Sequence, residues 1–446
     1  MPLIPRRLVN NFRDGRIWHF AGALAARAME AAGKFGLYML AARLMGGTES
    51  GFFFLCLTWT NLCTTLARMG LERAMSRHIA AELAIGNGTA ARRVLMEGLG
   101  WTALASSAAA ILTFVLSRPI AVLLFGQPAL AHPLAIAAFI LPPQTMAFAI
   151  GFALIGLNRG IAGQMVQSAL PPVLSLVALL AGLNQIDRVL EVYAGSYTIC
   201  CIPGLALIAR DWRHVMVERF SAAAGAAERL PTLWVTARPF LVIEMVQVSL
   251  LSAPVLLLGV VGTPVAVSAF SIISRLTNLI NTILLSVTMI AAPAFAAHHR
   301  RQEYAALRAV ERHARMVSLA ICLPVIGGLL VFAHPLLSLM HSDMSGAASA
   351  LFVLMAGQFV NTLLPTQDMV LSMTGHGDVL RRLNLQQLFA CLALCAALIP
   401  PFGMMGAAIA SSVCLSQGRV SFALAVRRVL PLLSAATMLG GKAPRT

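Results

Sequence analysis

The sequence predicts an all-α, polytopic membrane protein of about 12 transmembrane helices. Three observations lead there. Apolar residues make up 59% of the 446 residues and charged residues 11%, less than half of the roughly 25% charge of soluble domains. Apolar runs long enough to cross a bilayer, about 20 residues each, follow one another along the whole chain. The formal charge of +16 comes from basic residues gathered in alternate connections, which indicates a membrane orientation signal and not nucleic-acid binding.

The spans are set by where the apolar runs are interrupted by charged, Gly, Pro or Asn residues. Long stretches with few charges are typical of membrane helices. The first apolar run is long and is interrupted by Arg27, Glu30 and Lys34, which argues against a signal peptide. In chain order the predicted spans are 17–43, 50–70, 95–117, 132–157, 164–183, 192–209, 236–260, 265–293, 316–339, 348–373, 383–400 and 404–426.

The connections between these spans carry a strongly uneven charge. The N-terminus, the even-numbered loops and the C-terminal tail together hold 24 basic residues, whereas the opposite loops hold only Arg118 and Arg188. Cytoplasmic loops of membrane proteins are enriched in Arg and Lys. The pattern therefore predicts that both termini are cytoplasmic.

Three short stretches recur at a nearly constant offset. Ser117–Phe125 is similar to Ala333–His341, Gly47-Thr48 matches Gly262-Thr263, and Asn158-Arg159-Gly160 matches Gly375-His376-Gly377. The offset predicts two six-helix halves, 1–215 and 230–446, joined by a cytoplasmic linker at 216–229, with a short cytoplasmic tail. Transporters built from repeats commonly bind substrate between their halves, near the middle of the membrane.

The first span carries three charged residues on one helical face. Arg27, Glu30 and Lys34 lie within about 60° of one another around a helix. A charge costs roughly 2.5–3.5 kcal/mol at the centre of a membrane helix, so this face should meet a partner helix or water. One interpretation is a self-neutralised structural pair, because Glu30 can reach either cation. One cation still remains, and this favours a site for an anion.

Polar faces recur in three later spans. In span eight, Ser271, Arg275 and Asn278 share a stripe. Glu244 and Gln247 of span seven could supply a partner, and an Arg275–Glu244 bridge is the structural alternative to substrate binding. In span ten, Asn361 and Asp368 share a face. We therefore expect Arg27, Lys34, Arg275, Asn278, Ser271, Gln247 and Asn361 to bind substrate, and Glu30, Glu244 and Asp368 to form ion pairs or couple an ion.

Motifs for bond chemistry are missing from the sequence. There is no Gly-x-x-x-x-Gly-Lys-Ser/Thr stretch for a nucleotide, no Gly-x-Ser-x-Gly and no His-Glu-x-x-His. The eight cysteines fall inside apolar runs and have no accompanying His or acid. The sequence therefore predicts a transporter and not an enzyme, with no metal and no cofactor.

Two stretches near the second span resemble a known family. Arg43-Leu-Met-Gly-Gly-Thr-Glu-Ser-Gly-Phe-Phe-Phe54 is similar to the join between the first two helices of polysaccharide repeat-unit flippases, and Leu66–Met75 resembles the exit of their second helix. The resemblance extends over nearly the whole chain, including the six-plus-six duplication. These flippases serve O-antigen or exopolysaccharide synthesis. Their superfamily, the multidrug/oligosaccharidyl-lipid/polysaccharide exporters, also contains multidrug and toxin extrusion (MATE) antiporters and peptidoglycan-precursor flippases.

The resemblance implies a MATE-like, V-shaped bundle in the bacterial inner membrane. Such a protein moves an undecaprenyl-pyrophosphate-linked oligosaccharide across the bilayer by alternating access, and it can work with polysaccharide polymerase or export machinery. Cationic side chains of the first and eighth helices line the cavity in this family, and Arg27 or Lys34 and Arg275 occupy the corresponding places. Some members carry two further C-terminal helices that this sequence lacks.

Two other functions remain as alternatives. A cation-coupled multidrug exporter of the same superfamily should have an acidic, aromatic cavity, whereas the expected interior holds three bases and two acids. A membrane-embedded polysaccharide polymerase or ligase would need a substantial outer loop, and the longest one here is about 118–131. The sequence therefore favours the flippase.

Overall fold

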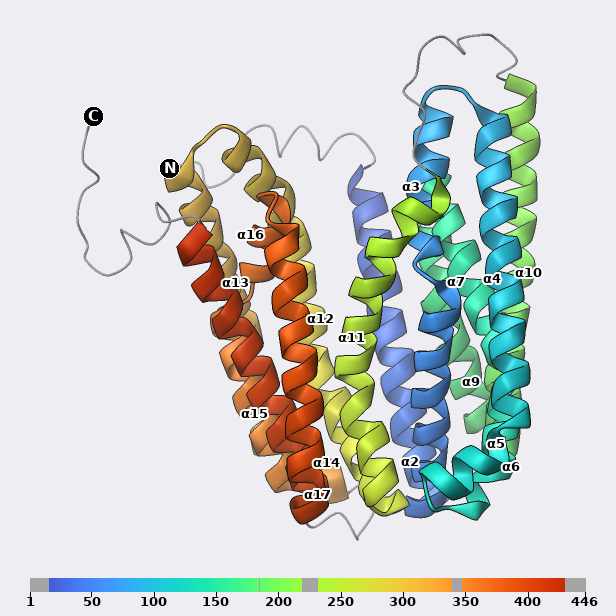
Figure 1. The fold of residues 1–446 in the computed structure, drawn as a ribbon, viewed down its shortest axis with the longest axis vertical. Helices are drawn as coiled ribbons and strands as arrows, with labels where there is room; N and C mark the ends of the chain where they lie inside the picture. Colours follow the sequence, from blue (N-terminus) through green and yellow to red (C-terminus); the bar gives the residue numbers. More distant parts are fainter. Residues whose placement is uncertain (1–15, 184, 219–231, 339–346, 430–446) are drawn as a thin grey trace. The chain divides into compact units, whose positions relative to one another are not determined.

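The computed structural model describes residues 16–183, 185–218, 232–338 and 347–429, and all regular elements in these ranges are helical (Figure 1). The chain divides into two compact units, 1–248 and 249–446. The predicted linker 216–229 lies largely outside the described residues, as do both predicted cytoplasmic ends.

The first unit consists of long α-helices and several short helical segments, of which η1 and η3 are π-helical and η2 is a 3₁₀ helix. Its elements are α2 (Arg16–Arg68), α3 (Leu71–Ala84), α4 (Gly88–Val115), α5 (Ser117–Pro119), η1 (Ile120–Leu124), η2 (Pro128–Leu130), α6 (Ala131–Ala138), α7 (Leu141–Gly156), α8 (Gly160–Gln164), η3 (Met165–Ala169), α9 (Leu170–Leu180), α10 (Ile186–Glu218) and the first part of α11 (Leu233–Val261).

The second unit takes the rest of α11 and the helices that follow. These are α12 (Pro264–Arg300), α13 (Tyr304–Val331), α14 (Ala333–Ser338), α15 (Ala347–Leu363), α16 (Gln367–Met373) and α17 (Gly377–Val429).

The two longest helices, α2 and α17, are hairpins, each broken at a glycine. Gly46 has φ 76° and ψ 172°, and Gly403 has φ 54° and ψ −127°, conformations that glycine adopts without the steric cost of a Cβ. The two arms of α2 meet where the rings of Tyr38 and Phe54 lie 5.6 Å apart. In α17, Gln387 Nε2 donates to the Cys414 carbonyl at 3.0 Å.

Eight helices of the described residues are long and apolar enough to span a membrane, and two bent helix pairs raise the number to ten. The bent pairs are 128–138 with 141–156, at 41°, and 347–363 with 367–373, at 42°. Since each hairpin holds two of the predicted spans, these ten segments correspond to all twelve. The chain is an all-α, multi-pass membrane protein, as predicted.

Prolines explain where several spans depart from regular helix. Pro142 and Pro143 stand in the first turn of α7, where a missing N–H costs nothing, and Pro365 lies in the break between α15 and α16. Pro171 and Pro172 follow the π-helical turn η3. Proline has no backbone N–H, so these two residues leave the carbonyl groups one turn earlier without their α-helical hydrogen bonds, and the regular α-helix is interrupted there.

Small residues let the helices approach closely. A Cβ at Gly33 would lie 2.7 Å from Val173, and one at Gly36 2.8 Å from Leu176, so the first arm of α2 packs tightly on α9. In the second unit, Gly357 of α15 meets Ser412 of α17 in the same way.

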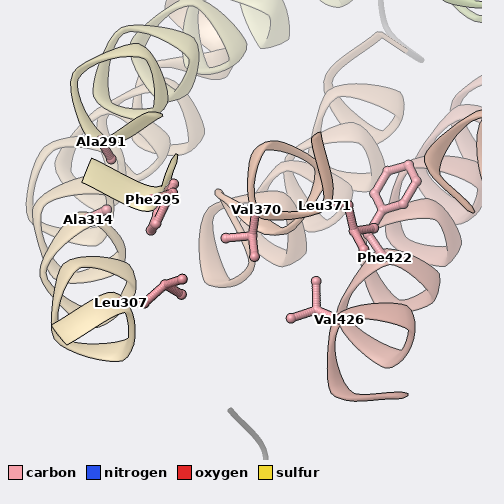
Figure 2. Packing of buried hydrophobic residues seen from close by; sticks show 8 residues of the cluster. All are labelled: Ala291, Phe295, Leu307, Ala314, Val370, Leu371, Phe422 and Val426. Carbon is pink, nitrogen blue, oxygen red and sulfur yellow. The ribbon is translucent and has the colours of Figure 1, made fainter. Parts of the chain in front are cut away.

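An apolar cluster of the second unit packs around the short helix α16 (Figure 2). Val370 and Leu371 of α16 pack with Phe422 and Val426 of α17. The remaining buried members come from α12 and α13 and are Ala291, Phe295, Leu307 and Ala314. The cluster fixes the short helix α16, which carries Asp368, against its neighbours.

Candidate functional site

Glu30, on the first arm of α2, is the centre of a polar network in the first unit. Its Oε1 accepts from Lys34 Nζ at 2.6 Å. Its Oε2 accepts from Gln164 Nε2 at 2.7 Å and from Ser168 Oγ at 2.9 Å. Gln167 Nε2 in turn donates to Gln164 Oε1 at 3.0 Å. Both carboxylate oxygens are therefore held, one by a cation and one by neutral donors.

Lys34 lies on the accessible side of this network. Its side chain is 34% exposed, against 17% for Glu30. Tyr38 and Tyr197 lie close enough to interact with its charge, and Tyr197 is buried beside Tyr193, with 3.4 Å between the two hydroxyls. The ammonium is thus bound to one carboxylate but remains within reach of a second anion.

Arg27 is exposed and forms no ion pair or hydrogen bond with a described residue. It lies one turn before Glu30, near the start of the candidate span 25–68. A guanidinium at this depth needs water or an anion as a neighbour, because the hydrocarbon offers neither. Of the three charges of this face, Arg27 is the one left available.

Gln164, Gln167 and Ser168 belong to this site but were missed by the sequence analysis. They come from α8 and η3, at positions i, i+3 and i+4. Three polar residues with that spacing inside an apolar run, just before a Pro-Pro pair, are a signal that could have identified them. A π-helical turn within a helix frequently marks a functional position.

In the second unit, four side-chain amides form a chain between α12 and α15. Asn281 Nδ2 donates to Asn278 Oδ1 at 3.1 Å, and Asn361 Nδ2 donates to Asn281 Oδ1 at 2.7 Å. Asn361 Nδ2 also donates to Gln358 Oε1 at 2.9 Å. The structure thus joins the expected residues Asn278 and Asn361 through Asn281, which the sequence analysis did not select.

Two buried oxygens near this chain accept no hydrogen bond from a described residue. They are Asn361 Oδ1 and Ser271 Oγ, and both residues are at most 2% exposed. Leaving such a group without a partner is costly. These atoms can accept from a donor supplied by water or by a substrate.

The acids of spans seven and ten have basic partners within their own units. Glu244 of α11 pairs with Arg73 of α3, and Asp368 Oδ1 lies 3.1 Å from Arg419 Nη1 of α17. Arg275 is half-buried on α12, and Gln247 is exposed on α11. Glu244 is therefore already paired within its own unit, and the alternative Arg275–Glu244 bridge stays a prediction.

No group of three His, Cys, Asp or Glu side chains in the described part of the chain is arranged to hold a metal ion. The oxygens and ammonium groups above suit an anion with hydroxyl groups better than a transition metal, which prefers imidazole or thiolate.

His78 of α3 makes a buried contact that should depend on pH. Its Nε2 lies 2.9 Å from Thr236 Oγ1 of α11. Burial and then the charge of Arg77 lower the pKa of His78 below its ordinary 6.5. Below pH 6.5 the unfolded chain takes up a proton that the native imidazole resists, so stability falls as the pH drops from 6.5 toward the lowered value.

We expect His78→Gln to flatten the decrease in melting temperature between about pH 6.5 and the lowered pKa of His78. Thermal unfolding of the purified protein across this pH range measures it. His313→Gln on α13, where the side chain is exposed, is the control and should retain the wild-type slope. An unchanged slope in His78→Gln would show that His78 does not titrate in this way.

Comparisons with known proteins place the fold. No family model and no curated protein matches the sequence. An inward-facing structure of a multidrug resistance MATE family transporter of the MOP superfamily aligns with a TM-score of 0.72 at 14% identity, over 94% of this chain and 99% of that one. The lipid II flippase MurJ, in an inward closed conformation, aligns with a TM-score of 0.68 at 13% identity, over 92% and 87%.

A MATE transporter of Vibrio cholerae, VcmN, aligns in its bent form with a TM-score of 0.57 at 16% identity, over 93% of this chain and 99% of that one. The chain has the same fold as these transporters. The MATE-like fold that the resemblance implies is therefore confirmed. Since proteins of this fold include both a multidrug transporter and a lipid flippase, the substrate has to be argued from the side chains.

Proposed function

We propose that this protein is a flippase that moves undecaprenyl-pyrophosphate-linked oligosaccharide repeat units across the bacterial inner membrane for polysaccharide biosynthesis. One observation carries the proposal. The three acids of the candidate site, Glu30, Glu244 and Asp368, all have basic partners, whereas Arg27 has no ion pair among the described residues. The Glu30 network of the first unit therefore offers a cation, Arg27, to a substrate, while its own carboxylate is already paired.

Arg27 and Lys34 suit a pyrophosphate in two successive steps. A guanidinium binds phosphate oxygens with charge-assisted, often bidentate hydrogen bonds. Two turns further, Lys34 can turn from Glu30 to a phosphate, because Glu30 keeps its hydrogen bonds from Gln164 and Ser168. A second anion can therefore bind Lys34 while the Glu30 carboxylate keeps hydrogen bonds from Gln164 and Ser168.

Each unit also carries further candidate substrate-binding residues: Gln247 of α11 in the first unit, and Arg275, Asn278, Ser271 and Asn361 in the second. The free acceptors Asn361 Oδ1 and Ser271 Oγ suit sugar hydroxyl groups, which donate. The polyprenyl tail would stay in the bilayer, and no bond is made or broken. Glu30, Glu244 or Asp368 could couple an ion through their basic partners.

The multidrug exporter remains the second candidate, because a MATE transporter has the same fold. Cationic drugs are bound by carboxylates and aromatic faces, and the neutralised acids argue against such a cavity. A polymerase or ligase would have to bind the same lipid-linked sugar and also catalyse its transfer, and the Glu30 network that supports the proposal contains no hydroxyl paired with a histidine.

Deletion of the gene tests the proposal. Surface polysaccharide should be lost, and lipid-linked repeat units should accumulate in the cytoplasmic leaflet. Susceptibility to cationic dyes should be unchanged. Normal polysaccharide together with increased dye sensitivity would instead support the exporter.

The same strain, complemented with reporter fusions at each end of the protein, tests whether both termini are cytoplasmic.

A further inference from the structure

A buried carboxyl group that the proposed transport site does not use lies on α3, next to the residue that joins α3 to α11 by an ion pair. Glu72 is 2% exposed. Its Oε1 lies 3.4 Å from Arg68 Nη1, while its Oε2 is buried and accepts no hydrogen bond from a described residue. A fully buried carboxylate with one free oxygen is costly to keep ionised.

Arg68 offsets only part of the cost of burying the Glu72 carboxylate, because its guanidinium also interacts with two other groups. Its Nη2 donates to Thr65 Oγ1 at 2.9 Å, and its guanidinium lies 4.4 Å from the centre of the Phe148 ring of α7. Its Nε is buried with no partner among the described residues. The guanidinium therefore divides its interactions between a hydroxyl, an aromatic face and a carboxyl group at a long distance.

The second acid of the contact comes from α11. Glu244 pairs with Arg73, the residue next to Glu72, and its negative charge acts on Glu72. The α7 helix has no charged residue, and the charged residues of α4, Arg92, Arg93 and Glu97, are exposed. Arg238 of α11 and Arg77 of α3 are exposed as well, and Glu82 lies ten residues further along α3. The charges that act on Glu72 are Arg68, Arg73 and Glu244.

Burial is the largest influence on Glu72 and raises its pKa above 4.5, and Glu244 adds to this effect, whereas Arg68 and Arg73 oppose it. The contact therefore favours the protonated, neutral acid. The coupling is mutual: an ionised Glu72 repels the carboxylate of Glu244 and so weakens the position of α11 beside Arg73, whereas the neutral acid does not.

Residues 233–248 of α11 are held to the rest of the first unit at several further points. His78 reaches Thr236, and the rings of Trp101 and Trp234 lie 5.5 Å apart. The backbone of Gly70 lies directly against Ala237 and Leu241. The remainder of α11, from Ser249, belongs to the second unit, so this contact holds the helix by which the chain passes from one unit to the other.

We propose that Glu72 is a proton-binding group, and that its protonation strengthens the attachment of residues 233–248 of α11 to α3. The carboxylate takes its proton from water and returns it to water. At high pH the ionised group weakens the contact, and at lower pH the neutral acid stabilises it. His78 acts in the opposite direction, because its protonation disrupts the contact with Thr236. The inference concerns α11 and does not depend on the substrate.

Hydrogen exchange of the amides of residues 233–248, measured by mass spectrometry on the purified full-length protein, tests the proposal. Glu72→Gln imitates the protonated acid. Its exchange in this segment should be slower than in the wild type at neutral pH, by roughly threefold or more. Glu244→Gln removes the partner of Arg73 and should accelerate exchange. Glu97→Gln, at an exposed acid of α4, should leave exchange unchanged.

A pH series isolates the titrating group. In a His78→Gln background, exchange of residues 233–248, corrected for the intrinsic rate, should slow as the pH is lowered. Adding Glu72→Gln should remove that dependence. A pH dependence that persists with Glu72→Gln, or equal exchange in Glu72→Gln and wild type at every pH, would overturn the proposal. Since no transport is measured, failure here leaves the proposed function standing, and failure of the flippase assay leaves this inference standing.

Discussion

Alanine at Arg27 is expected to lower the delivery of surface polysaccharide by about tenfold or more, because one hydrogen-bonded charge on a phosphate contributes about 1.5–3 kcal/mol. The measurement is surface polysaccharide and lipid-linked repeat units in the deletion strain, complemented at matched protein levels. Arg27→Lys keeps the charge and should retain part of the activity.

The matched control for Arg27→Ala is Arg43→Ala. Arg43 is exposed on the same arm of α2, close to the break at Gly46, and should tolerate the change. Arg275→Ala, made alongside, tests the second cation of the proposed site. Full transport by the Arg27→Ala, Arg275→Ala double variant would remove both residues from substrate binding.

Alanine at Gly70 is expected to be the most destabilising single substitution in the first unit. Gly70 has φ 70°, and a Cβ there would lie 2.5 Å from the Ala237 carbonyl oxygen and 2.6 Å from the Leu241 nitrogen. Both are backbone atoms of α11, so no change of side-chain rotamer can relieve the overlap. The left-handed conformation costs about 1–2 kcal/mol with a Cβ, and the overlap with α11 adds about 1–3 kcal/mol.

Gly86→Ala separates these two contributions. Gly86 has φ 78°, but a Cβ there would meet nothing within 4 Å. It should show the conformational cost alone. Melting temperatures of the two purified variants give the comparison. Equal losses would mean that α11 moves away from Gly70 at little cost, and that the α3–α11 contact is weaker than its geometry indicates.

The architecture was readable from the sequence because membrane spans depend on composition over long windows. Averaging over about 20 residues makes each span insensitive to single positions. The breaks at Gly46 and Gly403, where the backbone leaves the helical conformation, likewise fall at predicted span boundaries. The boundaries of α8, η3 and α9 were not separable, because a π-helical turn has the same composition as the helix around it.

The predicted duplication stays a prediction, but two helices support it. α4 (Gly88–Val115) and α13 (Tyr304–Val331) both contain 28 residues and begin and end 216 positions apart. Residues with positive φ also recur at nearly the same offset: Gly86 corresponds to Gln302, and Asn158 corresponds to Gly375. Backbone geometry thus repeats where side-chain identity does not.

The candidate site was only partly predictable, for a physical reason. The stripe of Arg27, Glu30 and Lys34 follows from helical periodicity within one segment. The partners of these residues lie on other segments, and pairing across segments depends on packing. For this reason the sequence left Glu244 without its partner Arg73, and it left Gln164 and Ser168 out of the site.

The π-helical turn η3 has a consequence for how this gene can change. A π turn holds one more residue than the α-helical turn it replaces. Because the wider turn takes up that extra residue, the helix before it and the helix after it keep the rotational phase of a regular α-helix. Loss of one codon within 165–169 would therefore restore an α-helical turn and still leave Gln164 facing Glu30 and α9 packed on α2. Such a deletion should change the local positions of Gln167 and Ser168 more than the packing of the helices.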